Sequence, residues 1–222
     1  MIQSIGFSKT YKNKVILKES DFEIKTNKIS FLMGPNGVGK TTTIKCLMEM
    51  EKHAGEFLFN GKTISDVRDQ CLVIWDDCPF YPNITGLHNL IIFSESKKSL
   101  AEIKEIALKY LDHNTLKNKV KTYSYGQKKK LALILVEILE PKYLIMDEIS
   151  NGLDYEGIKR LQKNIKAWSK NMTILLTGHQ FSFYNDIIDD LFAFKDHKIV
   201  LLKEDFSNSD KLLEEIYDEE IY

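Results

Sequence analysis

The stretch Gly34-Pro35-Asn36-Gly37-Val38-Gly39-Lys40-Thr41 has the pattern G-x-x-x-x-G-K-[ST]. The apolar run KISFLM at 28–33 precedes it, and TTTIKCLMEM at 41–50, a pattern typical of a helix, follows it. A strand, a glycine-rich turn and a helix in this order form the setting in which the pattern binds phosphate groups. The sequence therefore predicts a phosphate-binding loop, whose residues are Gly34, Asn36, Gly37, Gly39, Lys40, Thr41 and Thr42.

The residue types of this loop have chemical reasons. Glycines let the backbone approach phosphate closely, so that successive N–H groups point inward, and the start of the helix adds positive potential. Lys40 is placed to bridge the β- and γ-phosphates of a nucleotide and to act in catalysis, and the Thr41 hydroxyl is placed to bind Mg²⁺. We therefore expect a nucleotide and Mg²⁺ as the ligands of this loop.

A second motif is the run YLIMDE at 143–148, in which four apolar residues are followed by two acidic ones. A buried strand with this pattern presents Asp147 and Glu148 at its carboxyl end. Taken alone, the acidic pair is more typical of an ordinary turn after a strand. Together with the phosphate-binding loop, it predicts that Asp147 holds Mg²⁺ and that Glu148 orients or deprotonates the water that attacks the γ-phosphate.

A third motif is Ser124-Tyr125-Gly126-Gln127, which is followed by KKKLALILVEIL. Ser124 can cap the helix that starts here, which is an ordinary structural role, and the lysines on their own indicate only a solvated first turn. A serine hydroxyl and free N–H groups at the start of a helix can nevertheless also bind an anion. The position of Ser124, 23 residues before Asp147, favours this second interpretation.

The hydrophobic pattern divides the chain into three blocks. Short runs with a period of two predict strands in the first block, at 15–24, 28–33, 55–62 and 71–75. Between them, Asn27 is expected to adopt positive φ, and Asn60-Gly61 is a hairpin-turn signal. The second block is predicted to be helical, at 87–95, 101–112 and 126–140. The last of these helices is apolar nearly all round and should be buried.

The third block returns to alternating strands and helices. We expect two buried strands, a helix between them, a terminal hairpin and an acidic tail helix, at 143–147, 172–178, 156–168, 191–205 and 207–222. The tail helix is predicted to be a solvated surface helix with a Ser or Asp cap. No internal repeat or low-complexity segment interrupts the pattern.

The composition limits the class of protein. The chain has 222 residues, of which 43% are hydrophobic and 28% charged, and its formal net charge is −1, so that a disordered or fibrous chain is excluded and no nucleic-acid partner is expected. No apolar run reaches the ~18–20 residues of a membrane span, and the first residues lack the apolar core of a signal peptide. Cys46, Cys71 and Cys78 lack CxxC spacing, which argues against a disulfide framework or a zinc site. We therefore expect a soluble protein in a reducing compartment.

Together, these motifs resemble those of the ATP-binding subunits of ABC transporters, over nearly the whole chain. GPNGVGKTT stands as Walker A, YSYGQ stands where the signature LSGGQ belongs, and YLIMDE stands as Walker B. SNGLD at 150–154 matches the D-loop, and His179 in LLTGHQ matches the switch histidine that senses the γ-phosphate. Tyr11 matches the aromatic residue that stacks on adenine. Without the resemblance, Tyr11 would be an ordinary strand-edge tyrosine and His179 an ordinary residue at the end of a strand.

The sequence departs from the family pattern at three positions. Asp76 stands where the family usually has the glutamine of the Q-loop; a carboxylate can still bind Mg²⁺, but an ionised one donates no hydrogen bond. Tyr125 replaces the first glycine of the signature, which puts a bulky side chain where close approach to phosphate is expected. Ile149 replaces the usual proline after the Walker B glutamate, with a mild expected effect.

The resemblance also implies an architecture. We expect an α/β P-loop NTPase fold that forms a single ABC ATPase domain. Its RecA-like ATP-binding core, with an antiparallel β subdomain, would comprise residues 1–76 and 141–222, and an inserted α-helical subdomain would comprise residues 77–140. The helical subdomain would carry the signature motif.

The function that the resemblance implies is that of the ATP-hydrolysing subunit of a bacterial ABC transporter, at the inner face of the cell membrane. Two such subunits, in a homodimer or a heterodimer, would sandwich two ATP molecules. Each nucleotide would then meet Ser124, Gly126 and Gln127 of the opposite subunit, with Asp154 of the D-loop beside it. A separate membrane-spanning subunit would dock near residues 76–90.

Two other functions stay open. A binding or regulatory module that holds ATP with weak or no turnover is suggested by Asp76 and Tyr125. A non-transport ABC ATPase of the chromosome or repair type would need a long coiled-coil insertion, and the sequence contains none.

Overall fold

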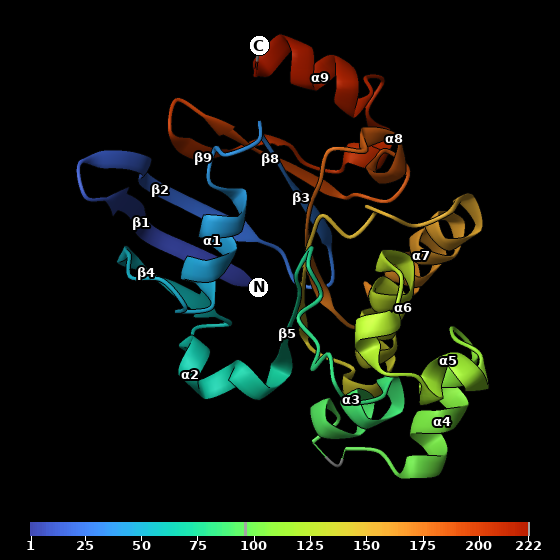
Figure 1. Ribbon diagram of the computed structural model, residues 1–222. Coiled ribbons are helices and arrows are strands. Elements are labelled where there is room, and N and C mark those ends of the chain that lie inside the picture. The colour runs from blue at the N-terminus through green and yellow to red at the C-terminus, as the bar shows by residue number, and fades with distance from the viewer. Residues whose placement is uncertain (96, 222) are drawn as a thin grey trace.

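The computed structural model describes residues 1–95 and 97–221, and its central element is a six-stranded sheet (Figure 1). In spatial order its strands are β5 (Cys71–Ile74), β6 (Tyr143–Asp147), β7 (Thr173–Thr177), β3 (Ile29–Met33), β8 (Asp190–Lys195) and β9 (Lys198–Lys203). All neighbouring strands are parallel except β8 and β9. Strands β3, β6 and β7 are buried along their whole length, which requires cover on both faces of the sheet. The expected α/β fold is confirmed.

The strand order decides which motifs meet. The phosphate-binding loop follows β3 and the acidic pair lies at the end of β6, with β7 between these two strands. The carboxyl ends of parallel strands lie at one edge of a sheet. Residues that follow β3, β6 and β7 therefore come together there, although the ends of β3 and β7 are about 140 residues apart in the chain.

A second, antiparallel sheet of three strands lies beside the first. Its order is β2 (Lys14–Ile24), β1 (Ile2–Tyr11) and β4 (Ala54–Phe59). β1 was not expected from the sequence. A register shift between Ser4 and Phe7, with Gly6 at φ +59°, breaks its alternation of polar and apolar residues, which explains why the pattern did not reveal it. Apolar side chains of both sheets and of the helix after the phosphate-binding loop form one shared core.

Both turn predictions of the first block hold. Asn27 has φ +57°. Asn60 and Gly61 have φ +50° and +76°, and the flanking Phe59 and Lys62 exchange two backbone hydrogen bonds of 2.7 and 3.2 Å. Positive φ at both central residues is the geometry of the tight hairpin turn that Asn-Gly favours.

The helices expected from the sequence are present, with changes at their ends, and three short helices that were not predicted, at 64–67, 113–117 and 181–184, lie between them. In chain order, the helices are α1 (Lys40–Leu47), α2 (Ile64–Val67), α3 (Gly86–Phe93), α4 (Leu100–Leu108), α5 (His113–Lys117), α6 (Tyr125–Leu139), α7 (Tyr155–Trp168), α8 (Phe181–Tyr184) and α9 (Leu213–Glu220). Short 3₁₀ turns lie at Arg68–Gln70, Val120–Thr122 and Phe206–Asn208. The helix expected at 101–112 ends earlier, because the Asp112 carboxylate caps a separate helix by accepting from the N–H groups of Asn114 and Thr115.

Helix α6 packs on both sides, which explains its nearly uniform apolar character. Ala132, Leu133 and Val136 belong to the core against the large sheet. Other α6 side chains pack with α3, α4 and α5 in a separate core, and these are Leu131, Ile134, Leu135 and Ile138. The prediction that this helix is buried is confirmed.

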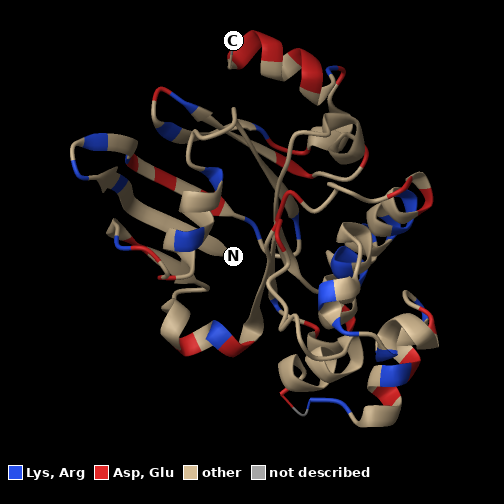
Figure 2. Ribbon diagram, viewed as in Figure 1, with Lys and Arg blue, Asp and Glu red and all other residues tan. Residues whose placement is uncertain are grey.

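The acidic tail differs from its prediction. Its helix α9 has Leu212 in the capping position rather than Ser or Asp, and it buries Leu213 and Ile216 against the core of the large sheet. The tail is therefore packed on one face, whereas most of the acidic residues of α9, which are red in Figure 2, are exposed. Tyr222, the last residue of the predicted tail, lies outside the described residues. Within the described part of the chain, no helix has both the length and the apolar character that crossing a membrane requires.

Candidate functional site

The loop between β3 and α1 encloses one side of a pocket of about 250 Å³ at the carboxyl edge of the large sheet. Gly37 and Gly39 have φ of +76° and +127°, and a Cβ at position 39 would lie 2.8 Å from the Ile16 side chain. This backbone path is therefore open to glycine and closed to larger residues. The pocket is lined by Asn36, Gly37, Gly39, Lys40, Thr41, Thr42, Asp76, Asp147 and Glu148.

Lys40 is the first residue of α1, directly after this loop, and is almost fully buried. Its ammonium donates hydrogen bonds to the carbonyl oxygens of Gly34 at 2.7 Å and of Pro35 at 3.2 Å. Burial lowers the pKa of Lys40, and the nearby carboxylates of Glu148 and Asp147 work in the opposite direction. The ammonium is thus held across the mouth of the loop, where a phosphate chain would pass.

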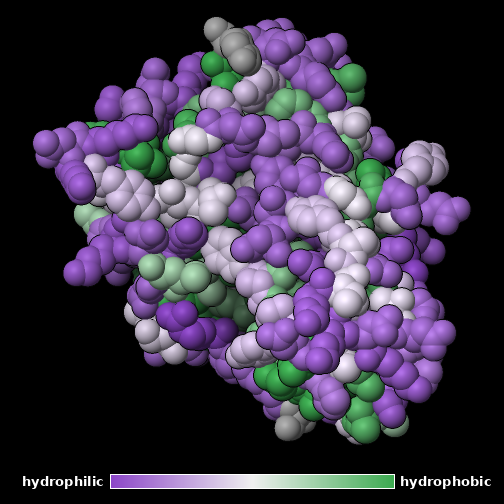
Figure 3. Space-filling model, in the orientation of Figure 1, coloured by the Kyte–Doolittle hydropathy of each residue, from purple (hydrophilic) through white to green (hydrophobic). Residues whose placement is uncertain are grey.

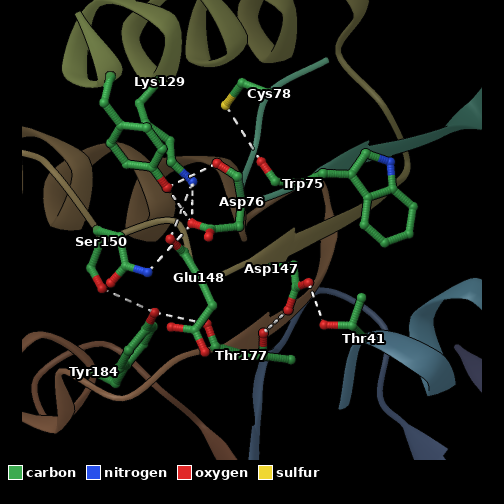
Figure 4. A network of polar contacts seen from close by, with 12 residues as sticks. Thr41, Trp75, Asp76, Cys78, Lys129, Asp147, Glu148, Ser150, Thr177 and Tyr184 are labelled. Atoms are coloured by element: carbon green, nitrogen blue, oxygen red, sulfur yellow. Dashed lines mark hydrogen bonds and ion pairs between the residues drawn. The ribbon is translucent and has the colours of Figure 1, made fainter. Parts of the chain in front are cut away.

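Asp147 is buried and receives two hydroxyl hydrogen bonds (Figure 4). Thr41, at the start of α1, donates to its Oδ2 at 2.7 Å, and Thr177, at the end of β7, donates to its Oδ1 at 2.5 Å. A hydroxyl and a carboxylate are hard oxygen ligands of the kind that Mg²⁺ prefers. The residues present therefore fit a magnesium ion held by Thr41 and Asp147.

Glu148, the next residue, has a backbone φ of +53°, which is uncommon for a residue with a side chain. Its Oε1 lies 3.2 Å from His179 Nε2, and its Oε2 is buried with no hydrogen-bond partner among the described residues. Burial raises the pKa of Glu148, and the charge of Asp147 adds to the increase. A carboxylate with a raised pKa and an unused oxygen is suited to accept a proton from water.

His179 lies between the Lys40 ammonium and the Glu148 carboxylate. Its Nε2 is 3.1 Å from the Lys40 ammonium and 3.2 Å from Glu148 Oε1. Burial and the charge of Lys40 lower the pKa of His179, which favours the neutral ring at physiological pH. Through this one nitrogen, the neutral ring can accept from Lys40 or donate to Glu148.

Tyr11, the residue expected to stack on adenine, ends β1 and does not line the phosphate pocket. The residue is 40% exposed, and the Lys9 ammonium lies 4.2 Å from the ring centroid. Lys9 is itself buried, and is held by Glu51 Oε2 at 3.2 Å and by the Lys52 carbonyl at 2.5 Å. An aromatic face is thus available at the surface with a cation packed against it.

The signature residues lie apart from this pocket. Ser124 is exposed at the start of α6, where its hydroxyl accepts from the Gln127 N–H and the Gln127 side chain accepts from the Ser124 N–H. Gly126 follows in the first turn. Asp154 caps α7 through a 2.7 Å bond from the Gly157 N–H. None of these four predicted ligand residues lines the phosphate pocket of its own chain.

Asp76 and Tyr125, two of the three departures from the family pattern, contact one another. Asp76 Oδ1 accepts from the Tyr125 hydroxyl, from Lys129 Nζ at 3.3 Å and from Asn151 Nδ2 at 3.4 Å. Burial alone would raise the pKa of Asp76, but the hydrogen bond from Tyr125 and the charge of Lys129 outweigh it and hold the pKa below its usual value. The Tyr125 ring lies against Gly152 of the D-loop, where a Cβ would be 2.1 Å from a ring carbon.

Two contributors to this site were missed by sequence reasoning. Lys129 was assigned to a solvated first turn, and this was wrong, because its side chain is completely buried. The signal was its spacing: Lys129, Ala132, Leu133 and Val136 lie at i, i+3, i+4 and i+7, on one helix face. Thr177 was identifiable only as a polar residue at the end of an apolar strand, two positions before His179.

Comparison with known proteins agrees with this geometry. The family model of the ABC transporter matches residues 17–151. The lantibiotic transport ATP-binding protein SrtF of Streptococcus pyogenes is 31% identical, and the match covers all of this chain and 97% of SrtF. The uncharacterized ABC transporter ATP-binding protein YcbN of Bacillus subtilis is also 31% identical, over 90% of this chain and 68% of YcbN.

Solved structures give the same fold. The chain superposes with a TM-score of 0.76 on cbiO1 of Clostridium perfringens, part of the ABC transporter complex cbiONQ, at 23% identity over 92% of this chain and 88% of that one. It superposes with a TM-score of 0.80 on an ATP-binding subunit of an ABC transporter, at 22% identity over 99% and 92% of the two chains. From its motifs, its fold and these relatives, the chain belongs to the ABC transporter family, among its ATP-binding subunits.

Proposed function

We propose that this chain hydrolyses ATP and that the hydrolysis drives transport through a separate membrane subunit. The observation that carries the proposal is the arrangement at the sheet edge (Figure 4): Thr41 donates to the buried Asp147, which adjoins a glutamate with an unused buried oxygen. The lysine of the phosphate-binding loop lies within reach of the same glutamate through His179. Phosphate binding, metal binding and water activation are thus all available in one pocket.

In the proposed reaction, Lys40 and the loop N–H groups hold the β- and γ-phosphates. Thr41 and Asp147 hold Mg²⁺, which supplies charge neutralisation to the phosphate oxygens when bound. Asp76, which lines the same pocket, is a further candidate ligand for this ion. The aromatic face of Tyr11 would stack on the adenine.

Glu148 orients the attacking water and accepts its proton. The water oxygen bonds to the γ-phosphorus as the bond from that phosphorus to the bridging oxygen breaks, which leaves ADP and inorganic phosphate. His179 is neutral and hydrogen-bonds toward the γ-phosphate, while its contact with Glu148 keeps the carboxylate in place.

We further propose that two copies of such a subunit close on two ATP molecules. The exposed position of Ser124, away from its own pocket, supports a role toward the nucleotide of an opposing subunit. Ser124, Gly126, Gln127 and Asp154 would complete the enclosure of that nucleotide. In this motion, residues 77–140 would move as a helical subdomain against a core of residues 1–76 and 141–222.

The experiment that tests this proposal traps the closed state. Glu148→Gln keeps the shape of the side chain but removes its ability to accept a proton, so ATP and Mg²⁺ should hold the variant as a dimer. Size-exclusion chromatography with light scattering measures this. A dimer that requires both ATP and an intact Lys40 supports the proposal; a monomer at saturating ATP argues against a homodimeric sandwich.

An apolar groove is a candidate docking surface for the membrane subunit. An apolar groove of about 190 Å³ lies between β5, α3 and α6, and it is lined by Leu72, Val73, Ile74, Trp75, Cys78, Pro79, Phe80, Phe93, Ala132 and Leu135. Figure 3 shows apolar side chains at the surface of the helical part of the molecule, where Ile92 and Tyr81 are each more than half exposed. We propose that a cytoplasmic segment of the membrane subunit docks here, which would place the chain on the inner face of the membrane.

A second candidate function is an ATP-binding regulatory module with weak or no turnover. The observation that favours it is the contact between Tyr125 and Asp76, because both side chains then hydrogen-bond within the chain. Steady-state ATP hydrolysis separates the two functions, because only a motor subunit should exceed the rate of Glu148→Gln. The non-transport alternative finds no support, because the longest helix of the described helical block, α6, has 15 residues and no coiled coil extends from it.

A further inference from the structure

Lys129 is a second buried cation of the site, besides Lys40. Its side chain has no exposed surface, although it lies in the first turns of α6 (Figure 4). Its ammonium lies 3.3 Å from Asp76 Oδ1, donates to the Glu148 carbonyl oxygen at 3.2 Å and lies 5.2 Å from the centroid of the Tyr125 ring. Burial of an ammonium is costly unless it is paired and hydrogen-bonded, so these partners explain how the position holds a lysine.

The carbonyl that Lys129 contacts belongs to a strained peptide. Glu148 has φ +53°, and its N–H donates to the Thr177 carbonyl at 3.2 Å. Its carbonyl accepts from Lys129 and from the Asn151 N–H at 3.3 Å. Bonds on both sides of the residue therefore fix a backbone conformation that a glutamate rarely adopts. Since the direction of the side chain follows from the backbone, these bonds also direct the carboxylate toward His179.

Asp76 holds Lys129 in place. Its Oδ1 is shared by Tyr125, Lys129 and Asn151, and the Tyr125 hydroxyl also lies 2.9 Å from the Asp76 carbonyl. The cluster joins the end of β5, the start of α6 and the loop after β6. Tyr125 and Lys129 both belong to α6, so a movement of this helix would change the contact to Glu148 directly.

We propose that Lys129 is a positioning residue for the hydrolysis proposed above. Its ammonium fixes the Glu148 peptide, and Asp76 is the counter-ion that makes this burial possible. Asp76 and Lys129 thus act as a matched pair that connects α6 with the water-activating glutamate. The effect on rate rests on the proposed function, whereas the effect on the loop does not.

The first test therefore measures the loop without nucleotide, by amide hydrogen exchange of residues 148–152. Lys129→Met keeps much of the volume of the side chain and removes its charge, and Lys128→Met, one residue earlier on the same helix, is the matched control. Loss of the bond from the buried ammonium should speed exchange in this loop about tenfold, with residues 131–138 of α6 unchanged. Unchanged exchange at 148–152, or an equal increase throughout the chain, would overturn the proposal.

The second test measures ATP turnover. We expect Lys129→Met to lower kcat about 10- to 100-fold with KM for ATP within about twofold, because the phosphate-binding residues are untouched. Asp76→Asn should lower kcat in the same direction, and the double variant should be no slower than the slower single variant. Independent losses that multiply, or a rise in KM equal to the loss in kcat, would contradict positioning. If the wild type itself lacks turnover, the proposed function fails, and the exchange measurement still decides the role of Lys129.

Discussion

At the scale of single residues, burial sets the charge behaviour of the pocket. Burial raises the pKa of Glu148 and lowers those of Lys40 and His179, so each group is shifted toward its neutral form. Attraction between Lys40 and Glu148 opposes the pKa shifts of these two residues. Such a site is costly for the folded protein in the absence of a ligand, and well adapted to proton transfer from water.

This cost predicts a pH-dependent gain in stability for Glu148→Gln in the nucleotide-free protein. The folded pKa of Glu148 lies above the ordinary value of 4.5, so the penalty is absent below 4.5 and grows as the pH rises toward the folded pKa. It is complete above that pKa. Thermal unfolding should therefore give a higher Tm for Glu148→Gln than for wild type at pH 7, and equal values near pH 4. A difference that is the same at both pH values would contradict the assignment of the shift to this carboxyl group.

Site residues could be predicted from the sequence where they belong to a motif. They were predicted less well where their role depends on contacts between distant parts of the chain. Lys40, Thr41, Asp147 and Glu148 were singled out by spacing, and the structure brings them to one pocket; their ligand roles stay predictions. The role of Lys129 depends on Asp76 and on the Glu148 carbonyl, which approach it only through the folding of β5 and β6 against α6. No local pattern contains that information.

At the scale of elements, helix caps are a recurring device of this chain. Ser99 and Ser124 each begin a helix, and each exchanges hydrogen bonds with the residue three positions later, Glu102 or Gln127. The two caps are chemically alike. They differ in that Ser124 is also proposed to meet a nucleotide across the dimer.

Substitution of the two serines separates these roles. Ser99→Ala and Ser124→Ala should each lower the free energy of unfolding by about 1 kcal/mol, because each removes a capping hydroxyl. Only Ser124→Ala should also suppress ATP hydrolysis. Urea unfolding and phosphate release measure the two effects. Equal loss of activity in both variants would mean that Ser124 acts only as a cap.

Strands and long helices were predicted well, because their patterns are strong and local. β3, β6 and β7 were each recognised as short apolar runs. The prediction failed at two elements. β1 was missed, because a register shift near Gly6 breaks its pattern, and α9 buries Leu213 in spite of its acidic composition. The order of strands in the sheet cannot be read from pattern, because every buried parallel strand looks alike.

At the scale of the whole molecule, the pocket lies where parts of the chain far apart in sequence meet. The large sheet shares one core with the antiparallel sheet and another with α6 and α9, while α3 to α6 form a third. A ligand that binds the phosphate loop and Asp147 together would connect the ends of β3 and β6. Binding should therefore stabilise the molecule as a unit.

Thermal unfolding with and without ATP and Mg²⁺ tests this connection. Ligand at 100 times its Kd contributes about 2.7 kcal/mol, which corresponds to a rise in Tm of about 5–10 °C for a chain of this size. Lys40→Ala should lose the rise, and removal of Mg²⁺ with a chelator should reduce it. An equal rise in Lys40→Ala would place the nucleotide elsewhere on the protein.

Phosphate release by the purified chain shows whether this pocket hydrolyses ATP through Glu148. Rates are measured at saturating ATP and Mg²⁺ for wild type and Glu148→Gln, with ATP binding determined separately for both. We expect Glu148→Gln to bind ATP as well as wild type does and to release phosphate about 10²- to 10⁴-fold more slowly, as for loss of a general base. Equal rates in the two proteins, or no turnover in wild type that still binds ATP, would contradict the account.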